Sequence, residues 1–311
     1  FAGFTEYMPG RNRGTWSSRV SFIGNWSYPL CSLIAMGLTP LISAEWNWRV
    51  QLLIPAILSL IATALAWRYF PESPRWLESR GRYQEAEKVM RSIEEGVIRQ
   101  TGKPLPPVVI ADDGKAPQAV PYSALLTGVL LKRVILGSCV LIAMNVVQYT
   151  LINWLPTIFM TQGINLKDSI VLNTMSMFGA PFGIFIAMLV MDKIPRKTMG
   201  VGLLILIAVL GYIYSLQTSM LLITLIGFFL ITFVYMYVCY ASAVYVPEIW
   251  PTEAKLRGSG LANAVGRISG IAAPYAVAVL LSSYGVTGGF TLLGAGSIIV
   301  AIAIATIGIE T

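Results

Sequence analysis

The 311-residue sequence contains no histidine, and only 12% of its residues are charged. Without histidine there is no imidazole to bind a metal, act as a general base or carry a proton. The sequence also lacks a GxSxG motif and a cysteine spacing typical of a metal site, because its three cysteines each lie inside an apolar run. We therefore expect no enzyme, no metal and no cofactor. Soluble domains carry about 25% charged residues, so a chain with 56% apolar residues is predicted to be a membrane protein.

Eight apolar runs are long enough to cross a bilayer, for which a helix needs about 20 residues. Prolines at positions 29, 156 and 274 interrupt some of them, which neighbouring helices in a bundle can accommodate. Runs of this length indicate helices, so the predicted fold class is an all-α membrane protein. The runs cover residues 17–42, 50–69, 134–159, 170–191, 199–216, 220–246, 260–284 and 287–309.

The basic residues lie almost entirely on one side of the membrane that these eight spans define. Nineteen of the 22 lie in or next to alternate connections, beginning with the segment before residue 17. The other side receives Arg49 and Lys167, and Arg267 lies within a span. Because cytoplasmic loops carry the excess of lysine and arginine, the basic side is predicted to be cytoplasmic. The net charge of +7 is thus a signal of membrane orientation, and no nucleic-acid partner is expected.

The longest connection, residues 71–132, interrupts the hydrophobic pattern. Ser73 and Pro74 are typical of a helix start. After Gly81, apolar residues recur at helical spacing from Ala86 to Ile98, with charged residues between them. The Pro-rich stretch 102–121 predicts a linker. We interpret the whole connection as a cytoplasmic helical loop that tethers two halves of the protein, with a gating contact as the alternative.

One charged phrase occurs twice in this apolar chain. Glu6-x-x-Pro9 is followed by Arg13-Gly14, and Glu248-x-x-Pro251 is followed by Arg257-Gly258. Each copy lies on the predicted cytoplasmic side and precedes a span that contains a proline. Transporters are often built from repeated halves with the substrate site between them. The repeat therefore predicts two related bundles, and the start at Phe1 indicates a piece of a longer protein that lacks the beginning of the first bundle.

These phrases resemble the major facilitator superfamily, in the branch that joins sugar porters to organic-ion, aromatic-acid and niacin transporters. The sugar-porter-type markers are the first copy of the phrase, "PESPRWL" at 71–77, "DKIPRK" at 192–197 and "PEIWPTEAKLRG" at 247–258. The phrase "NAVGRISGIAAP", residues 263–274, is more similar to the organic-ion, aromatic-acid and niacin branch. The likeness covers essentially the whole chain, and is strongest to bacterial inner-membrane metabolite transporters.

The resemblance implies the major facilitator fold, in which twelve helices form two pseudo-symmetric six-helix bundles. About eight complete transmembrane helices of the expected twelve would be present here. Residues 1–70 would form the C-terminal part of the first bundle, 71–132 the cytoplasmic connecting loop, and 133–311 the second six-helix bundle.

Arg267 is the most informative single residue of the spans. It lies ten positions beyond Arg257, hence about 15 Å deeper along a helix, and a charge near mid-bilayer suggests function by default. A guanidinium matches a carboxylate with two parallel hydrogen bonds. We therefore predict a cationic anchor for an anionic substrate, with Asn263 one turn away. The alternative is a structural arginine that bonds backbone carbonyls or a polar neighbour.

Several polar side chains on other spans are candidate substrate-binding residues. In an apolar span such side chains are expected to point inward, where they bind either substrate or a neighbouring helix. The run 134–159 places three of them on one face, spaced four residues apart. Tyrosines in the sixth run and an asparagine in the first offer weaker candidates. The set comprises Asn145, Gln148, Tyr149, Asn153, Tyr237, Tyr240 and Asn25.

The charged cytoplasmic residues are expected to form a gate rather than a ligand site. The resemblance implies that they lock the cytoplasmic side when the protein faces outward, through contacts that form in one conformation only. The predicted gate residues are Glu6, Arg13, Glu72, Arg75, Asp192, Arg196, Glu248 and Arg257.

The preferred functional interpretation is a secondary active transporter that takes up a small organic anion, linked to protons, by alternating access. One alternative is a facilitator or proton symporter of a neutral polar solute such as a sugar. A second is a transporter-like nutrient sensor, which a large additional cytoplasmic tail would indicate. The expected partners are a small-molecule substrate, protons and the lipid bilayer. The protein is expected to be a monomer in the bacterial inner membrane.

Overall fold

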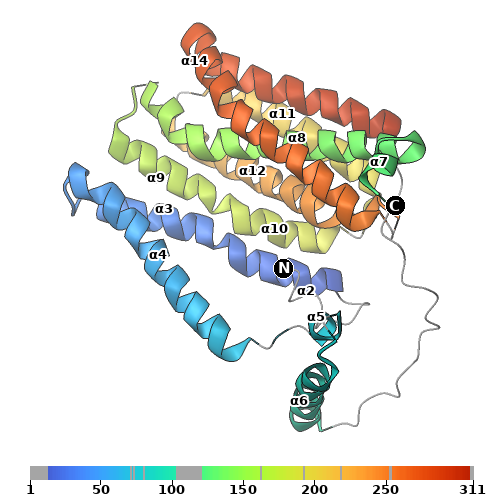
Figure 1. Cartoon of the computed structure of the whole chain (residues 1–311). Helices are drawn as coiled ribbons and strands as arrows, with labels where there is room; N and C mark the ends of the chain where they lie inside the picture. The colour runs from blue at the N-terminus through green and yellow to red at the C-terminus, as the bar shows by residue number, and fades with distance from the viewer. Residues whose placement is uncertain are drawn as a thin grey trace. The chain divides into compact units, whose positions relative to one another are not determined.

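The computed structural model describes residues 13–311 except 71, 73, 80, 103–120, 162, 192, 218, 252–253 and 309–311. The chain divides into two compact units, one of Phe1–Ser17 with Ile42–Ala116 and one of Ser18–Leu41 with Pro117–Thr311 (Figure 1). Glu6, Asp192 and most of the predicted linker lie outside the described residues, as do the side chains of Arg13, Arg75 and Asn153.

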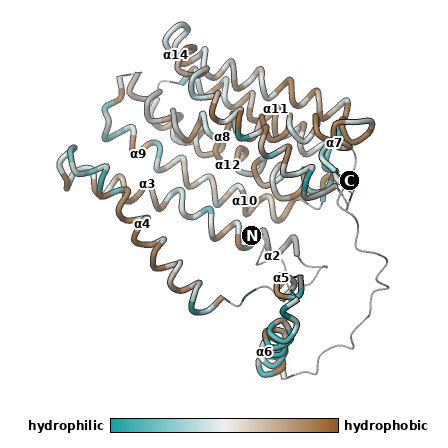
Figure 2. The backbone as a smooth tube through the Cα atoms, viewed as in Figure 1, coloured by the Kyte–Doolittle hydropathy of each residue, from teal (hydrophilic) through white to brown (hydrophobic). Residues whose placement is uncertain are grey.

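The first unit contains one long apolar helix and a pair of helices from the connecting loop. The long helix α4 spans Ala44–Tyr69, with Pro55 inside it. The pair consists of α5, Pro74–Ser79, and α6, Tyr83–Thr101, which contact each other. Leu77 and Ala86 are each only 2% exposed, so the two helices bury these residues against each other, whereas Met90, Val97 and Ile98 farther along α6 are exposed. The hydrophilic residues of α6 are visible in Figure 2. The predicted helix start at Pro74 and the helix from Ala86 to Ile98 are confirmed.

The second unit contains most of the apolar helices, which lie side by side in Figure 1. Helix α14 combines two spans, because the chain reverses at Gly285, whose φ of 66° is one that residues with a side chain rarely adopt. A π-helical turn continues α12, and the two belong to one span. The elements are α2 Arg13–Asn25, α3 Ser27–Leu38, α7 Tyr122–Leu125, α8 Gly128–Thr161, α9 Leu166–Met177, α10 Gly179–Val190, α11 Arg196–Ser215, α12 Met220–Cys239, the turn Tyr240–Tyr245, α13 Val246–Glu248 and α14 Lys255–Ile307.

Seven helical stretches among the described residues are long and apolar enough to cross a membrane. They correspond to seven of the eight predicted runs, and every regular element described is helical, which confirms the all-α class. The seven stretches are Glu45–Tyr69, Gly128–Ile152, Lys167–Val190, Arg196–Ser215, Met220–Glu248, Arg257–Val286 and Gly288–Ile307.

The eighth predicted run, residues 17–42, forms two shorter helices instead of one. Helix α2 ends at Asn25 and α3 begins at Ser27, with Trp26 in the turn between them. Proline has no N–H to donate to the carbonyl four residues earlier, so Pro29 leaves the carbonyl of Asn25 without its helical partner. The interruption at the proline therefore shortens each helix below the length of a full span.

Helix α3 belongs by its contacts to the second unit, where it packs on α9. Thr174 of α9 donates a hydrogen bond to the carbonyl of Ser32 at 3.4 Å, and the rings of Tyr28 and Tyr235 lie 5.1 Å apart. These units differ from the predicted bundles, which were divided at residues 70 and 133. When two bundles enclose a common cavity, a helix of one bundle can also contact the other. The contacts of α3 therefore do not decide its bundle, and the assignment of residues 17–70 to the first bundle stays a prediction.

Membrane orientation can be tested by labelling cysteines with a membrane-impermeant maleimide, after replacement of Cys31, Cys139 and Cys239. A cysteine at Gln217 or Ser283 is expected to react only from the side opposite the cytoplasm, because Gln217 follows, and Ser283 lies close to the end of, a span that begins at a basic connection. A cysteine at Lys193 is the control and is expected to react from the cytoplasm. Labelling of position 217 or 283 from the cytoplasm would contradict the predicted orientation.

Candidate functional site

Arg267 lies on an exposed face of α14 and contacts a polar residue of α8. Its Nη1 donates a hydrogen bond to the hydroxyl of Tyr149. Within the part of the chain that the structure describes, the ion pairs found do not include Arg267. The guanidinium therefore keeps donors that a ligand could use, and Tyr149 restrains its direction.

The close packing of α8 on α14 explains why these two residues meet. A β-carbon on Gly266 would lie 2.9 Å from the side-chain nitrogen of Asn145, and one on Gly270 would lie 3.0 Å from the ring of Tyr149. Small residues let transmembrane helices approach closely. The two glycines flank Arg267 along α14, so the approach that they permit places Tyr149 within reach of the guanidinium.

Asn145 is buried in this helix contact rather than open to a ligand. Its amide nitrogen donates to the carbonyl of Leu141 at 2.7 Å, and its amide oxygen is buried without a hydrogen-bond partner. A buried acceptor without a partner is costly. Asn145 therefore packs against α14 at Gly266, and its amide oxygen finds no donor in the part of the chain that the structure describes.

A second set of polar side chains comes from three helices, α3, α8 and α12. Gln148 of α8 and Tyr28 of α3 lie close to the hydroxyl of Tyr235 of α12, although that hydroxyl makes no hydrogen bond in the structure. Tyr28 and Tyr235 were not among the predicted site residues. Tyr28 directly precedes Pro29, and a polar aromatic residue beside a proline inside an apolar run is the signal that could have identified it.

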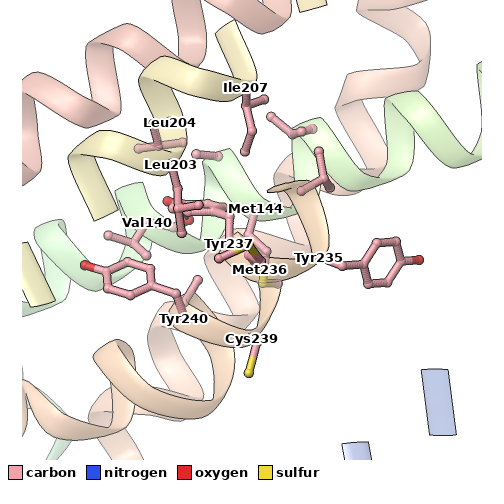
Figure 3. Packing of buried hydrophobic residues seen from close by; sticks show 14 of the residues in the cluster. Val140, Met144, Leu203, Leu204, Ile207, Tyr235, Met236, Tyr237, Cys239 and Tyr240 are labelled. Carbon is pink, nitrogen blue, oxygen red and sulfur yellow. Dashed lines mark hydrogen bonds between the residues drawn. The ribbon is translucent and has the colours of Figure 1, made fainter. Parts of the chain in front are cut away.

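Three other predicted residues use their polar groups within or between helices. Asn25 and Asn263 each donate to a backbone carbonyl one turn earlier, Ser21 at 2.7 Å and Ser259 at 2.9 Å. Tyr237 is 1% exposed and donates to the carbonyl of Val140 at 3.1 Å. Figure 3 shows Tyr237 and Tyr240 in the same packed core, and the centres of their rings lie 5.8 Å apart.

Tyr240 is fully buried, with its hydroxyl against Gly200 of α11. In this conformation Tyr237 and Tyr240 pack helices together. A contact of either tyrosine with substrate stays an untested prediction, and Asn153 lies outside the described side chains.

The gate prediction is represented by one ion pair. Arg196, at the start of α11, contacts Glu248 of α13 at 3.2 Å, and it also donates to the carbonyl of Met191. Both partners lie in the second unit, so this pair ties together parts of one unit. Glu72 is exposed in the first unit. A lock between bundles stays a prediction.

The second copy of the repeated phrase is also held by contacts that do not involve its acids. Arg133 of α8 donates to the carbonyl of Ile249 at 2.6 Å, and Arg257 lies over the ring of Tyr122 at 5.3 Å. A β-carbon on Gly258 would lie 2.4 Å from the ring of Trp250. The glycine of the Arg-Gly pair therefore provides the space that the tryptophan ring occupies.

Glu248→Gln tests whether the Arg196–Glu248 pair affects transport. The side chains are 15% and 37% exposed, and partly exposed pairs contribute about 0–1 kcal/mol, so folding should be unchanged. If the pair forms in one conformation only, turnover should fall by about tenfold, a change of about 1.4 kcal/mol in the barrier. Transport rates and melting temperature would be measured on the full-length protein. Glu85→Gln is the control, because Glu85 pairs with Arg82 on the surface of α6. If the two variants transport at equal rates, the Arg196–Glu248 pair does not affect turnover. The charged phrase would then only mark the orientation in the membrane.

No group of three histidine, cysteine, aspartate or glutamate residues that could hold a metal ion is found among the described residues. The site therefore consists of a cation, hydroxyl groups and amides between apolar helices. Such a set can bind and orient a small polar ligand, as the few polar groups of a mostly apolar pocket do.

Comparison with known proteins identifies the family. The model of the Major Facilitator Superfamily matches residues 2–274. Two proteins of Escherichia coli K12 align with the whole chain: YdjK, provisionally named a metabolite transport protein, is 99% identical over 311 residues, and YdjE, named an inner membrane metabolite transport protein, is 44% identical over 313 residues. The chain spans 68% of the length of each.

More distant matches agree with this assignment. The niacin transporter NiaP of Acinetobacter baylyi is 24% identical over 280 residues, which cover 90% of this chain and 62% of the relative. The solved structure of the proton:xylose symporter XylE, a protein of E. coli, matches with a TM-score of 0.65 at 21% identity, over 99% of this chain and 67% of that chain, which shows a common fold. The chain therefore belongs to the major facilitator superfamily, and it is a multi-pass metabolite transport protein of the bacterial inner membrane rather than an enzyme.

Proposed function

We propose that the protein is a secondary active transporter of a small organic anion and works by alternating access. The observation that carries this proposal is the cation Arg267 inside the span Arg257–Val286, where its guanidinium donates a hydrogen bond to Tyr149. A cation in a membrane span is costly and needs a partner. A substrate carboxylate supplies both the charge and the paired acceptors that a guanidinium binds.

One relative supports an anion without defining it. NiaP is named for niacin, which is a carboxylate at neutral pH. Tyr149 would serve as a positioning residue, since it holds the guanidinium from α8 while the substrate approaches from the exposed face of α14.

Proton coupling belongs to the same proposal. In the described spans, acids occur only near the ends, at Glu45, Asp168 and Glu248. We therefore expect a proton-carrying acid in the part of the full-length relatives that this chain does not span. A pH gradient across the membrane should then increase the uptake of the substrate.

A neutral solute such as a sugar is the second candidate. The specific observation in its favour is the uncharged group of Gln148, Tyr28 and Tyr235, which gathers an amide and two hydroxyls from three helices. Such groups suit the hydroxyls of a polyol, and XylE, with a similar fold, is named a xylose symporter.

Uptake by vesicles that contain the full-length protein distinguishes the two candidates. The panel would comprise labelled nicotinate, other small carboxylates, xylose and other neutral sugars, each with and without a pH gradient. The anion proposal expects saturable uptake of an acid that Arg267→Ala abolishes and Gln148→Ala reduces less. Uptake of a neutral sugar that Gln148→Ala abolishes and Arg267→Ala leaves unchanged would establish the second candidate instead.

A further inference from the structure

Two cavities lie along the same pair of helices, α8 and the second span of α14. One has a volume of about 320 Å³ and is lined by Lys132, Ile135, Thr306 and Ile307. The other has a volume of about 250 Å³ and lies between residues of α8 such as Ile142 and residues of α14 such as Gly296. In Figure 1 the start of α8 lies near the end of α14. The two cavities lie at successive depths along the contact between these two helices, and together they are called the groove below.

The depth of the groove matches one leaflet of a bilayer. Along α8, Lys132 and Cys139 are seven residues apart, which corresponds to about 10 Å, and Val147 lies about 22 Å from Lys132. Half of the hydrocarbon core of a bilayer is about 15 Å thick. A molecule with its polar end at Lys132 would therefore place a chain of leaflet length beside the deeper cavity.

The residues that line the groove change from partly polar at the shallow end to mainly apolar at the deep end. At the shallow end the Lys132 side chain is exposed, whereas the Thr306 hydroxyl donates to the carbonyl of Ile302 at 2.8 Å. The ammonium is therefore the group that the groove offers to a ligand there. The deeper cavity is bounded mainly by apolar residues, among them Cys139, Ile142, Val146, Leu293 and Val300.

Gly296 keeps the deeper part of the groove open. A β-carbon at this position would meet no other atom within 4 Å. The groove is also separate from Arg267 and its partner, since the residues that line the two cavities include neither Arg267 nor Tyr149, and those from α14 all belong to its second span. It does not belong to the substrate site described above.

We propose that this groove binds an anionic phospholipid of the cytoplasmic leaflet. The phosphate lies at Lys132, and one acyl chain lies between α8 and the second span of α14, beside Gly296. Lys132 belongs to the basic side that the positive-inside rule places in the cytoplasm. Basic pockets between transmembrane helices on that side are suited to acidic lipid head groups. The combination of one cation with an apolar groove of leaflet depth favours a lipid over a soluble anion.

The test is native mass spectrometry of the full-length protein during titration with phosphatidylglycerol. Lys132→Gln removes the cation, and one lysine near an anionic surface corresponds to about a fivefold change in affinity. Gly296→Leu fills the open groove and is expected to weaken binding by about tenfold. Phosphatidylcholine with the same acyl chains should bind more weakly and should not respond to Lys132→Gln. Inorganic phosphate should not compete.

Two matched variants serve as controls. Lys193→Gln removes an exposed lysine at the same end of the unit, and Gly202→Leu adds a side chain to α11 where a β-carbon also meets nothing within 4 Å. Both should bind phosphatidylglycerol as the parent protein does. The proposal is overturned if Lys132→Gln and Gly296→Leu match their controls, if only the lysine variant weakens binding, or if inorganic phosphate displaces the lipid.

Discussion

Arg267→Ala is expected to lower the affinity for a transported organic acid by about 10²–10³-fold. Breaking a buried pair of charges by removing one partner costs about 3–5 kcal/mol, which corresponds to this range of dissociation constants. In the full-length protein the substrate carboxylate would be left in a cavity of low dielectric without a counter-charge. Affinity would be measured by calorimetry on purified protein, with the acid identified by the uptake panel.

Arg267→Lys separates charge from geometry. An ammonium keeps the charge but cannot donate two parallel hydrogen bonds, so affinity should recover only in part. Tyr149→Phe removes the hydroxyl that accepts from Arg267, and should raise the dissociation constant by less than Arg267→Ala does, because the cation remains.

The structural alternative for Arg267 makes the opposite prediction. If the arginine mainly joins α14 to α8 through Tyr149, the alanine variant should melt at a lower temperature, and whatever folds should still bind acids. Melting temperature and affinity are therefore measured on the same preparations. Normal affinity in a stable alanine variant would remove the anion proposal and favour the neutral solute.

The sequence predicted the number and class of the helices well because both depend on composition over about 20 residues. The amphipathic pattern of α6 was equally informative, since Ala86 is buried and its charged neighbours are exposed. The break between α2 and α3 was not predicted. Pro29 was noticed as an interruption, but whether neighbouring helices keep such a span continuous depends on packing that a single sequence does not contain.

The sequence predicted the candidate site only in part, again because some of its features depend on packing. Depth along a helix follows from counting residues, so Arg267 could be singled out as a charge inside a span, and it lies within the helical stretch Arg257–Val286. Its position near mid-bilayer stays a prediction. Which helix faces it depends on tertiary packing, here on Gly266 and Gly270 against α8. Tyr237 illustrates the limit, because its spacing suits a lining face but its hydroxyl bonds the backbone of Val140 inside the core.

The second large effect is expected where a side chain is added to a helix contact that depends on glycine. Helix α10 packs on α12 through two glycines one turn apart. A β-carbon on Gly183 would lie 2.2 Å from the carbonyl oxygen of Thr232, and one on Gly179 would lie 2.4 Å from that of Phe228. These are backbone atoms, so no side-chain rotation can relieve the clash, and the helices themselves would have to separate.

Gly183→Val is therefore expected to destabilise the second unit by about 3 kcal/mol, the upper end for overpacking a well-packed core. In the full-length protein this should lower the detergent melting temperature by roughly 10 °C and reduce the amount of protein inserted. Gly202→Val is the control, since the same side chain on α11 would begin in open space. The control matters because valine and glycine also differ in intrinsic helix propensity, and Gly202→Val contains the same difference. Equal melting temperatures for the two variants would show that α10 and α12 are not in the close contact described, whereas a fall confined to Gly183→Val follows directly from the approach of the two backbones.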